Sequence, residues 1–282
     1  MIIVTGATGK IGRELVKLLA STRTSARAIA RDPSKLDNAG VPVVQADLSD
    51  PASLDRAFQG ANHLFLLSAT GEQQVLQERN AIRAAVRAGF HHVVKLSALG
   101  ADPASPLQLG RWHAESESEL KQSGLGWTIL QPHYFCQNLL GQQPSIHAEG
   151  AIYGSAGEGK VPFVDVRDIA MVAFATLTQP GYMGRSYVLT GGQAYSHAQA
   201  AELIGKAAGK QVRYVDLPAE TMQASLQAAG MPEWYARDLV GLMTFFRSGA
   251  AAELTPTIAE ITRKTPRTLE DFIRDHAHAF RS

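Results

Sequence analysis

The chain has 282 residues, of which 45% are hydrophobic and 19% are charged, a composition typical of a soluble globular protein. This length fits one large domain, or a domain with an appended smaller unit, better than two equal domains. The formal net charge is only +1 and no long run of Lys or Arg occurs, so we expect no binding of nucleic acid.

The cysteine count and the hydropathy of the chain indicate where the protein is located. Cys136 is the only cysteine, so no intrachain disulfide forms, and no Cys/His cluster has zinc-ligand spacing. We therefore expect no metal and a reducing, cytoplasmic location. The N-terminus reaches a glycine turn within a few residues and no apolar stretch reaches ~18 residues. We expect neither a signal peptide nor a membrane span.

The first twelve residues predict a strand, a phosphate-binding turn and a helix. Residues 2–4 are all β-branched, which suits a short buried strand, and apolar residues recur at helical spacing over 11–19. Between them, Gly6 permits a tight turn, Gly9 a close approach of a pyrophosphate, and Gly12 close packing of helix on strand. The free amides and dipole of the helix start form an anion site. The cofactor contacts expected here are Gly6, Thr8, Gly9, Lys10, Ile11 and Gly12. A structural turn that binds nothing is the alternative, because the spacing differs from the usual Gly-x-Gly-x-x-Gly.

A second strand, over 26–30, is followed directly by Arg31. The residue at this place faces the adenine ribose in a Rossmann unit, where an arginine favours the 2'-phosphate of NADPH and an acid the 2'-hydroxyl of NADH. With Lys35 adding a second charge, we expect NADPH, with NADH less favoured. If the strand ended one residue later, Asp32 would face the ribose and the preference would reverse. A solvated surface pair of Arg31 and Asp32 is the structural alternative.

Later strands supply the remaining cofactor contacts. A third strand over 41–46 leads to Asp47 and Leu48, which we expect against the adenine ring, although Asp47 alone is also suited to capping a turn. A fourth strand over 63–68 ends at Ser68 in small residues that leave room for the cofactor.

Strands and helices continue to alternate along the chain, with strands expected at 92–97, 127–131 and 185–190 and helices at 53–58, 73–88, 115–122 and 169–177. This alternation predicts an α/β fold, a Rossmann-type doubly wound parallel sheet with a smaller C-terminal α/β lobe. We expect residues 1–131 and 164–190 to form the NAD(P)-binding domain, and 132–163 and 191–282 the smaller substrate-cleft lobe.

The C-terminal part has a helical pattern over 197–208, a strand-like stretch over 212–217, and apolar helices beyond it. We expect this part to be a lid or substrate lobe, with core helices or an oligomer surface as the alternative. The expected substrate contacts are His133, Tyr134, Phe135, Trp234 and Phe245, each of which also suits a plain core position.

Several motifs together resemble the NmrA-like group of atypical short-chain dehydrogenases/reductases. The matches are residues 4–12, 97–100, the pair His113 and Glu117, 127–132, Asn138 and 163–170. The resemblance implies a Rossmann domain with a smaller C-terminal lobe, bound NADPH, a contact from Pro132 and a monomer or homodimer. Members of the group reduce quinones, azo dyes and triphenylmethane dyes, or act as redox-sensing regulators without turnover.

The chain departs from the wider superfamily at the catalytic Tyr-x-x-x-Lys pair, where Leu109 and His113 stand. Loss of the tyrosine removes a proton donor worth roughly 10²- to 10⁴-fold, which argues against an ordinary alcohol dehydrogenase. Ser97, His113 and Tyr134 are the candidate catalytic residues. Ser97 is also suited to satisfying a loop amide, and His113 to a local hydrogen bond.

Acceptors that delocalise the added charge need less acid help, so a small aromatic or quinoid substrate fits such a site. The sequence therefore predicts an NADPH-dependent reductase of quinones, azo dyes or triphenylmethane dyes. The alternative is a non-catalytic NADP(H)-sensing regulatory protein of the NmrA type.

Overall fold

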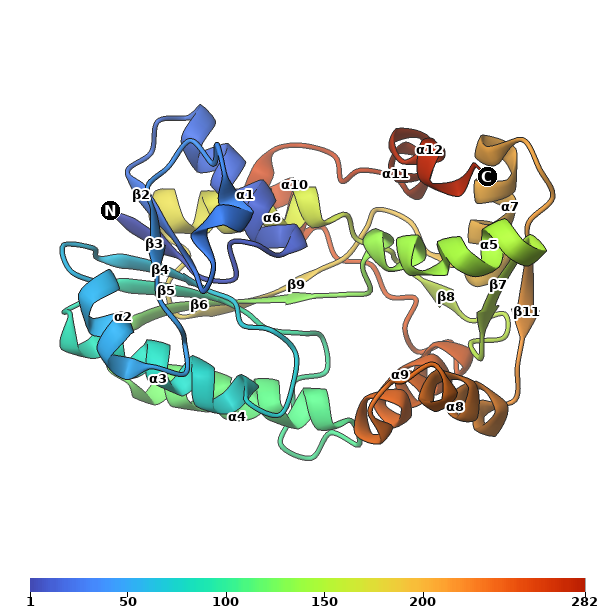
Figure 1. Ribbon diagram of the computed structural model, residues 1–282, viewed down its shortest axis with the longest axis horizontal. Helices are drawn as coiled ribbons and strands as arrows, with labels where there is room; N and C mark the ends of the chain where they lie inside the picture. Colours follow the sequence, from blue (N-terminus) through green and yellow to red (C-terminus); the bar gives the residue numbers. More distant parts are fainter. Residues whose placement is uncertain (282) are drawn as a thin grey trace.

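A seven-stranded parallel sheet forms the larger part of the computed structural model, which describes residues 1–281 (Figure 1). Its strand order is β3-β2-β1-β4-β5-β6-β9. The strands are β1 (Ile2–Val4), β2 (Ala26–Ala30), β3 (Val43–Gln45), β4 (His63–Leu66), β5 (His92–Leu96), β6 (Gly126–Pro132) and β9 (Arg185–Leu189). The predicted α/β fold class, with a doubly wound parallel sheet, is confirmed.

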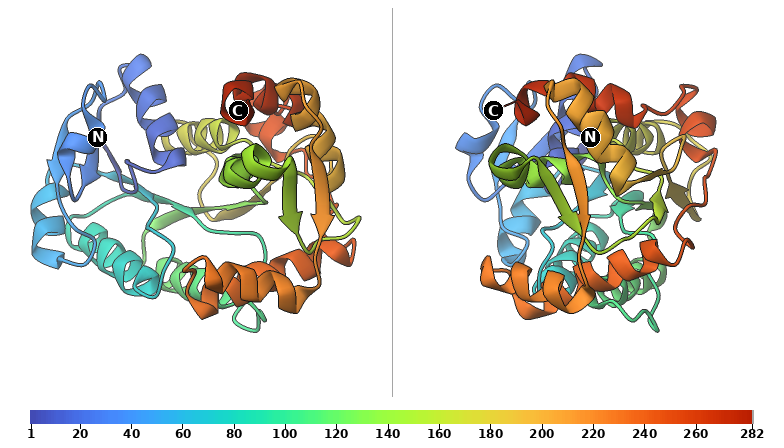
Figure 2. Two further views of the ribbon diagram at one scale, coloured as in Figure 1. Left: turned by 45° about the vertical axis from the view of Figure 1, so that its right-hand side comes forward. Right: turned by 90° about the vertical axis from the view of Figure 1, so that its right-hand side faces the viewer.

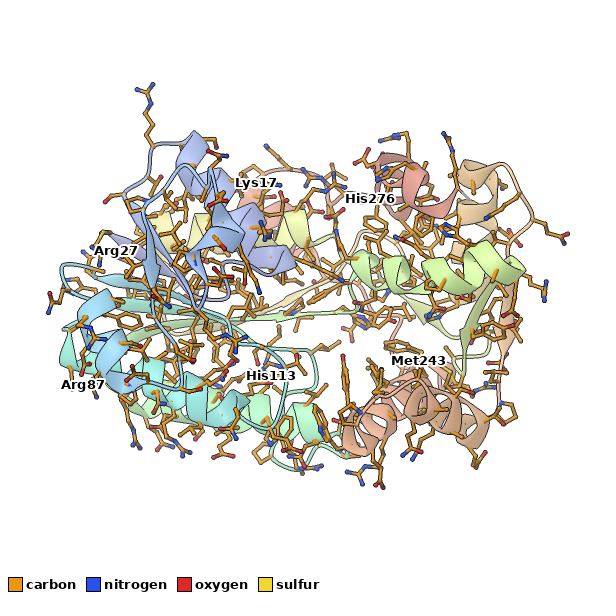
Figure 3. All side chains as sticks on the ribbon, in the orientation of Figure 1. Lys17, Arg27, Arg87, His113, Met243 and His276 are labelled. Carbon is orange, nitrogen blue, oxygen red and sulfur yellow. The ribbon has the colours of Figure 1, made fainter. Side chains whose placement is uncertain are left out.

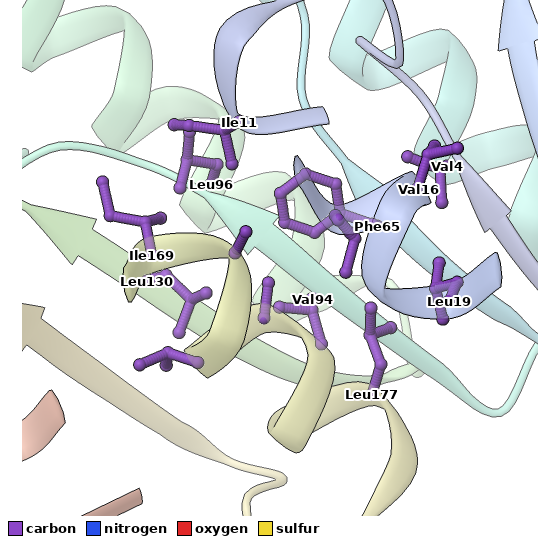
Figure 4. Close-up of a cluster of buried hydrophobic side chains, with 14 of the residues drawn as sticks. Val4, Ile11, Val16, Leu19, Phe65, Val94, Leu96, Leu130, Ile169 and Leu177 are labelled. Atoms are coloured by element: carbon purple, nitrogen blue, oxygen red, sulfur yellow. The ribbon is translucent and has the colours of Figure 1, made fainter. Parts of the chain in front are cut away.

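Helices cover both faces of this sheet (Figure 1). One face carries α1 (Lys10–Ser21) and α6 (Val166–Thr178), and the other carries α2 (Pro51–Ala57), α3 (Gln74–Arg87) and α4 (Gln108–Gln122). In the core on the α1 and α6 side of the sheet, Val4, Phe65 and Val94 of three strands belong to one hydrophobic cluster with Ile169 (Figure 4). Burial on both faces explains why β1 is wholly apolar.

The position of β1 in the sheet selects the ligand-binding edge. β1 pairs with β2 on one side and with β4 on the other, both in parallel. The chain leaves β1 in one direction and returns to its other side after β3, so the strand order reverses at β1. Ligands of open α/β sheets bind at such a switch point, outside the carboxyl ends of the strands. The glycine turn that follows β1 lies at this point.

The smaller part of the molecule is built on two short strand pairs (Figure 2). β7 (Ala151–Gly154) pairs in parallel with β11 (Arg213–Asp216), and β8 (Lys160–Val161) pairs antiparallel with β10 (Tyr195–Ser196). The helices of this part are η2 (Cys136–Gln142), α5 (Gln143–Glu149), α7 (His197–Ala208), α8 (Ala219–Ala228), α9 (Glu233–Arg247), α11 (Leu269–Asp275) and α12 (Ala277–Phe280). It has a hydrophobic cluster of its own that includes Phe163 and Phe246.

We infer the division into two units at the boundaries that the sequence predicts, with one qualification. Helix α10 (Thr257–Thr262) lies in the C-terminal segment, yet Ile258 and Ile261 belong to the same hydrophobic cluster as Val4 and Ile169. The C-terminal segment therefore returns to the larger unit at α10 before it ends in α11 and α12. Within residues 1–281, no helix combines the length and apolar character needed to cross a bilayer.

Several elements differ in extent from the sequence prediction. The strand expected over 63–68 ends at Leu66, and the helix expected over 169–177 begins at Val166. The helix expected over 115–122 begins seven residues earlier, at Gln108. Its first turn has no side-chain cap of its own, and the amide of Leu109 instead donates to Asp238 Oδ2 at 2.7 Å. Because this acceptor comes from 129 residues away, no local pattern reveals the helix start. The strand expected over 41–46 is shorter, with pairing confined to Val43–Gln45.

Candidate active site

The turn after β1 requires glycine at two positions. Gly6 adopts φ +60°, and a Cβ there would lie 2.7 Å from Leu67 Cγ at the end of β4. A Cβ on Gly12 would lie 2.2 Å from the carbonyl oxygen of Gly6, which is closer than two non-bonded atoms can approach. The Oγ1 of Thr5 donates to the Leu67 carbonyl at 2.9 Å and accepts from the Leu67 amide. These contacts hold the turn tightly between β1, α1 and β4.

The helix start beyond the turn presents free amides. Gly9 is the N-cap of α1 and supplies no side-chain hydrogen bond to the first helical turn. A Cβ at Gly9 would meet only the Gly6 carbonyl, at 3.2 Å, so the outer side of the turn is open. Uncapped amides, the positive end of the helix dipole and free space are what a pyrophosphate needs. Thr8 and Lys10 are exposed beside this opening, with Lys10 Nζ 3.2 Å from the Gln137 carbonyl.

Three exposed cations, Arg13, Arg31 and Lys35, form a group at the end of β2 that we call the cationic loop. Arg31 directly follows β2. Arg13 donates from Nε to the Thr8 carbonyl at 2.9 Å and from Nη2 to the Lys35 carbonyl at 2.7 Å, so it joins the glycine turn to this loop. Sequence reasoning missed Arg13, although a cation immediately after Gly12 was the available signal.

The acid at the end of β2 has a structural partner. Asp32 is the N-cap of η1 (Pro33–Leu36), and its carboxylate accepts from the Ser34 amide at 3.1 Å and the Ser34 hydroxyl at 2.6 Å. The Ser34 hydroxyl hydrogen bond lowers the pKa of Asp32 below its usual range. β2 ends at Ala30, so the register in which Asp32 would replace Arg31 does not occur. Among residues 1–281, no ion pair joins Arg31 to Asp32.

Asp47 and Leu48 follow β3 at the same edge of the sheet. Asp47 Oδ1 accepts from the Ser49 amide at 2.8 Å, so its carboxylate does cap a turn. Leu48 is half-buried against the core between the sheet and α3, and its carbonyl accepts from Asn80 Nδ2 at 3.0 Å. One carboxylate oxygen of Asp47 has no partner within residues 1–281 and is free for a further donor.

A buried polar group, which we call the Lys95 network, joins Ser68, Gln74, Glu78, Lys95 and His113. Lys95 on β5 and Glu78 on α3 form an ion pair at 2.8 Å, with exposed fractions of 0% and 1%. Glu78 Oε1 accepts from the Ser68 hydroxyl at 2.9 Å. His113 Nδ1 on α4 lies 3.1 Å from Gln74 Nε2 and 3.4 Å from Lys95 Nζ. Four elements thus converge on the predicted residues Ser68 and His113.

The electrostatics of this network hold His113 neutral. Burial, and then the nearby Lys95 charge, lower the pKa of His113 well below 6.5. Lys95 and Glu78 are not among the site residues predicted from the sequence. A lysine inside the apolar run of β5 was a usable signal, because a lysine in a strand buried on both faces needs a buried partner.

Ser97 lies at the end of β5 and has a charged partner. Its hydroxyl donates to Glu117 Oε1 at 2.6 Å, and the same oxygen accepts from Gln131 Nε2 at 2.9 Å. Glu117 Oε2 also pairs with Lys121 at 3.1 Å. The hydroxyl proton of Ser97 is thus directed toward a carboxylate on α4, which leaves its oxygen lone pairs as acceptors.

Pro132 ends β6, and the segment that follows carries His133, Tyr134 and Phe135. Burial raises the pKa of Tyr134 to about 12 and lowers that of His133 to about 4. His133 Nδ1 accepts from the Tyr134 amide at 2.7 Å. Phe135 forms a bridge with Val164 and packs on the main core, and Pro132 is the buried last residue of β6.

Helix α9 brings aromatic residues of the smaller unit to both α4 and the segment after β6. Trp234 meets Trp112 of α4 edge to face, with ring centroids 4.9 Å apart. Phe246 is fully buried and lies 5.4 Å from the Tyr134 ring and 5.8 Å from the His133 ring. Phe245, the residue predicted for substrate contact, is 40% exposed, and its contribution to a substrate site stays a prediction.

The seven-stranded sheet and the glycine turn at its switch point define a Rossmann-type dinucleotide-binding fold, and the reductases that match the whole chain place the protein among oxidoreductases with a nicotinamide cofactor. The family follows from the sequence as a whole. The model of the NmrA-like family matches residues 1–273, and the chain belongs to this family. The resemblance predicted from the motifs is confirmed.

Named relatives match the chain over almost its full length. An NAD(P)H azoreductase of Xenophilus azovorans is 38% identical over 283 residues, with 99% of each chain covered. Quinone oxidoreductase 2 of Escherichia coli is 33% identical over 279 residues, with 97% of each covered. The solved structure of the Escherichia coli NADPH-dependent quinone oxidoreductase in complex with NADPH has a TM-score of 0.89 at 32% identity, and the match covers 98% of this chain and 99% of that one.

Proposed function

We propose that the protein is an NADPH-dependent reductase that transfers hydride to conjugated, electron-poor acceptors of the quinone, azo-dye or triphenylmethane-dye type. The observation that carries the proposal is the open, uncapped helix start at Gly9, in a chain 33–38% identical to an azoreductase and a quinone oxidoreductase. NADPH, when bound, supplies the hydride. The side chains and backbone amides of the protein bind and orient the cofactor and the acceptor and exclude water.

The expected cofactor contacts follow the carboxyl edge of the sheet. The pyrophosphate lies on the glycine turn, between Gly6 and Gly12, where no side chain obstructs it. The cationic loop holds the 2'-phosphate, because a guanidinium binds phosphate bidentately and Asp32 is occupied by its own cap. Asp47 and Leu48 face the adenine, and Ser68 and Pro132 border the nicotinamide.

The choice of acceptor follows from the weak acids at the site. In this proposal Leu109 occupies the place of the superfamily tyrosine, and Tyr134, with a pKa of about 12, gives up a proton less readily than an ordinary phenol. Neutral His113 donates a hydrogen bond rather than a full positive charge. A quinone, an azo group or a dye cation spreads the incoming charge over its conjugated system, so a strong protein acid is not needed.

The substrate lies against His133, Tyr134 and Phe135, with Trp234 and Phe245 closing from the smaller unit. The contacts of Trp234 with α4 support a position for α9 across this edge. Ser97 offers oxygen lone pairs to the bound molecules, since its proton is directed toward Glu117. Aromatic walls of this kind align a flat acceptor with the nicotinamide and exclude water.

A panel of quinones, azo dyes and triphenylmethane dyes tests the proposal directly. Purified protein should consume NADPH with at least one class of acceptor, measured as loss of the reduced-cofactor absorbance. Gly9→Val should abolish turnover, because its side chain projects into the space for the pyrophosphate. The matched control is Gly141→Ala, at a glycine with no atom within 4 Å of its added Cβ, and it should keep full activity.

The competing hypothesis is an NADP(H) sensor without turnover. Tight NADPH binding, lost in Gly9→Val, with no reduction of any acceptor in the panel would favour the sensor and overturn the reductase. A reductase requires that turnover and binding fall together in the Gly9 variant.

A further inference from the structure

A buried ion pair such as Glu78–Lys95 adds little net stability to a fold compared with apolar residues. Both side chains are removed from water, and the free energy of desolvation offsets most of the attraction between two buried charges. Apolar residues of similar size would serve the packing between β5 and α3 as well. The pair contacts His113 on its other side, which directs attention to what it does to the imidazole.

The hydrogen-bond donors of Lys95 determine which nitrogen of the His113 imidazole carries the proton. An ammonium group has three donors and no acceptor. Lys95 Nζ forms an ion pair with Glu78 Oε2 at 2.8 Å and has two hydrogen-bond partners, the Leu96 carbonyl at 3.2 Å and His113 Nδ1 at 3.4 Å. The amide nitrogen of Gln74, also a donor, lies 3.1 Å from the same Nδ1. A nitrogen that accepts a hydrogen bond carries no proton, so Nδ1 is the bare nitrogen. In a neutral imidazole the proton then resides on Nε2.

We propose that the buried Glu78–Lys95 pair is a positioning device that locks His113 in the Nε2–H tautomer, so that the ring offers one N–H donor to the oxygen or nitrogen of the acceptor being reduced. The inference rests on the proposed function, since it assigns His113 to the same site. Lys95 and Glu78 touch neither substrate nor cofactor in this account and act only through His113.

Among residues 1–281, the one side-chain nitrogen within hydrogen-bond distance of His113 Nε2 is Gln74 Nε2 at 3.4 Å, and because an amide nitrogen is a donor only, it cannot accept the Nε2 proton. His113 is the neighbour of Trp112, whose ring meets Trp234 of α9, so this stretch of α4 borders the smaller unit (Figure 3). Hydride transfer leaves negative charge on the heteroatom of a quinone or an azo group. An N–H donor that is already oriented stabilises this charge without reorganisation during the reaction. The opposite tautomer would present a lone pair and repel the same atom.

The role of Glu78 is to balance the charge. An unpaired Lys95 would be a buried cation, at a high cost in free energy. Glu78 neutralises it at 2.8 Å and is itself held by the Ser68 hydroxyl, which orients the carboxylate. The pair therefore places a donor at Nδ1 while it adds no net charge to the site.

The tautomer is measured directly by NMR. In ¹⁵N-labelled wild-type protein at neutral pH, a long-range ¹H–¹⁵N spectrum should show His113 Nε2 as the protonated nitrogen and Nδ1 as the bare one. The signals are assigned by their disappearance in His113→Asn. A protonated Nδ1, or protons on both nitrogens, would overturn the proposal without the need for any further variant.

The double variant Lys95→Met/Glu78→Gln removes both charges and keeps an acceptor for the Ser68 hydroxyl. His113 should then populate both tautomers, while His92, which is held by Thr128 Oγ1 at 2.8 Å on the same strand, serves as the unchanged internal reference. We expect kcat to fall by about 10- to 100-fold with the NADPH Kd unchanged. An unaltered tautomer and an unaltered kcat would contradict the proposal.

The two hypotheses fail in different ways. Absence of turnover by the wild-type protein with every acceptor removes the proposed function, whatever the tautomer of His113. Turnover by a wild-type protein in which Nδ1 is protonated removes the positioning role and leaves the reductase intact.

Discussion

The cationic loop and the Lys95 network both lie at the carboxyl edge of the sheet, but they differ in burial and in origin. Arg13, Arg31 and Lys35 are exposed, and they come from one segment of the first two β-α units. Lys95 and Glu78 are almost wholly buried, and their network joins one strand, two helices and the loop after β4. The charges of the cationic loop remain hydrated and available to a ligand, whereas Lys95 and Glu78 in the Lys95 network neutralise each other. We expect the exposed charges to select the ligand, and the buried charges to set the protonation of the neighbouring His113.

The largest expected effect comes from breaking the buried pair on one side only. Lys95→Met leaves Glu78 without its partner and should lower the free energy of unfolding by about 3–5 kcal/mol. Denaturant titration measures this change. Lys95→Met/Glu78→Gln should recover much of the loss, because no lone charge remains. If the single and double variants are equally unstable, the pairing account of this network is wrong.

The second largest effect concerns the buried histidines, which make the stability of the fold depend on pH, unlike the exposed charges of the cationic loop. Burial lowers the pKa of His133 and His197 to about 4, while the unfolded chain has the ordinary value of 6.5. The unfolded state therefore binds protons first as the pH falls, so stability is full above about pH 6.5 and decreases down to about pH 4. Each histidine contributes up to about 1.4 kcal/mol per pH unit in this window.

His197→Phe tests this pH dependence. The phenyl ring suits the aromatic surroundings of Phe163 and Phe246 and cannot bind a proton. The slope of unfolding free energy against pH should become shallower between about pH 6.5 and 4. An unchanged slope would mean that His197 binds protons equally in the folded and unfolded states.

A smaller effect is expected in the cationic loop, where solvent screens each charge. Arg31→Ala should weaken NADPH binding about tenfold and leave NADH binding unchanged, because only NADPH carries the 2'-phosphate. Fluorescence titration with both cofactors measures the ratio. Lys206→Ala removes an equal charge from α7 in the smaller unit and serves as the control. Equal losses for both cofactors would remove Arg31 from the phosphate site.

The smallest expected effect is that of Arg13→Ala. Two of its guanidinium nitrogens already donate to the Thr8 and Lys35 carbonyls, so Arg13 shapes the loop more than it neutralises a ligand. We expect NADPH affinity to fall about two- to fivefold, with the loss reduced at high salt. A loss greater than that of Arg31→Ala would reverse the order of their roles.

The sequence predicted best what depends on neighbouring residues. The glycine turn, the parallel sheet and the place of Arg31 directly after the second strand follow from short patterns with a direct physical meaning. The Lys95 network did not follow, since its members are brought together from the loop after β4 and from α3, β5 and α4. The start of α4 depends on Asp238, which lies far away in the chain. On α9, helical spacing alone does not distinguish buried Phe246 from exposed Phe245.

Transfer of deuterium from the cofactor to the product shows whether the protein is a reductase. NADPH that carries two deuterium atoms at C4 of its nicotinamide is incubated with the protein and a triphenylmethane dye, and the colourless product is analysed by mass spectrometry. A reductase of the proposed kind places one deuterium on the central carbon of the dye, and the Gly9→Val variant yields no product. Product without deuterium, or NADPH binding with no reduction of dyes or quinones, would contradict the account.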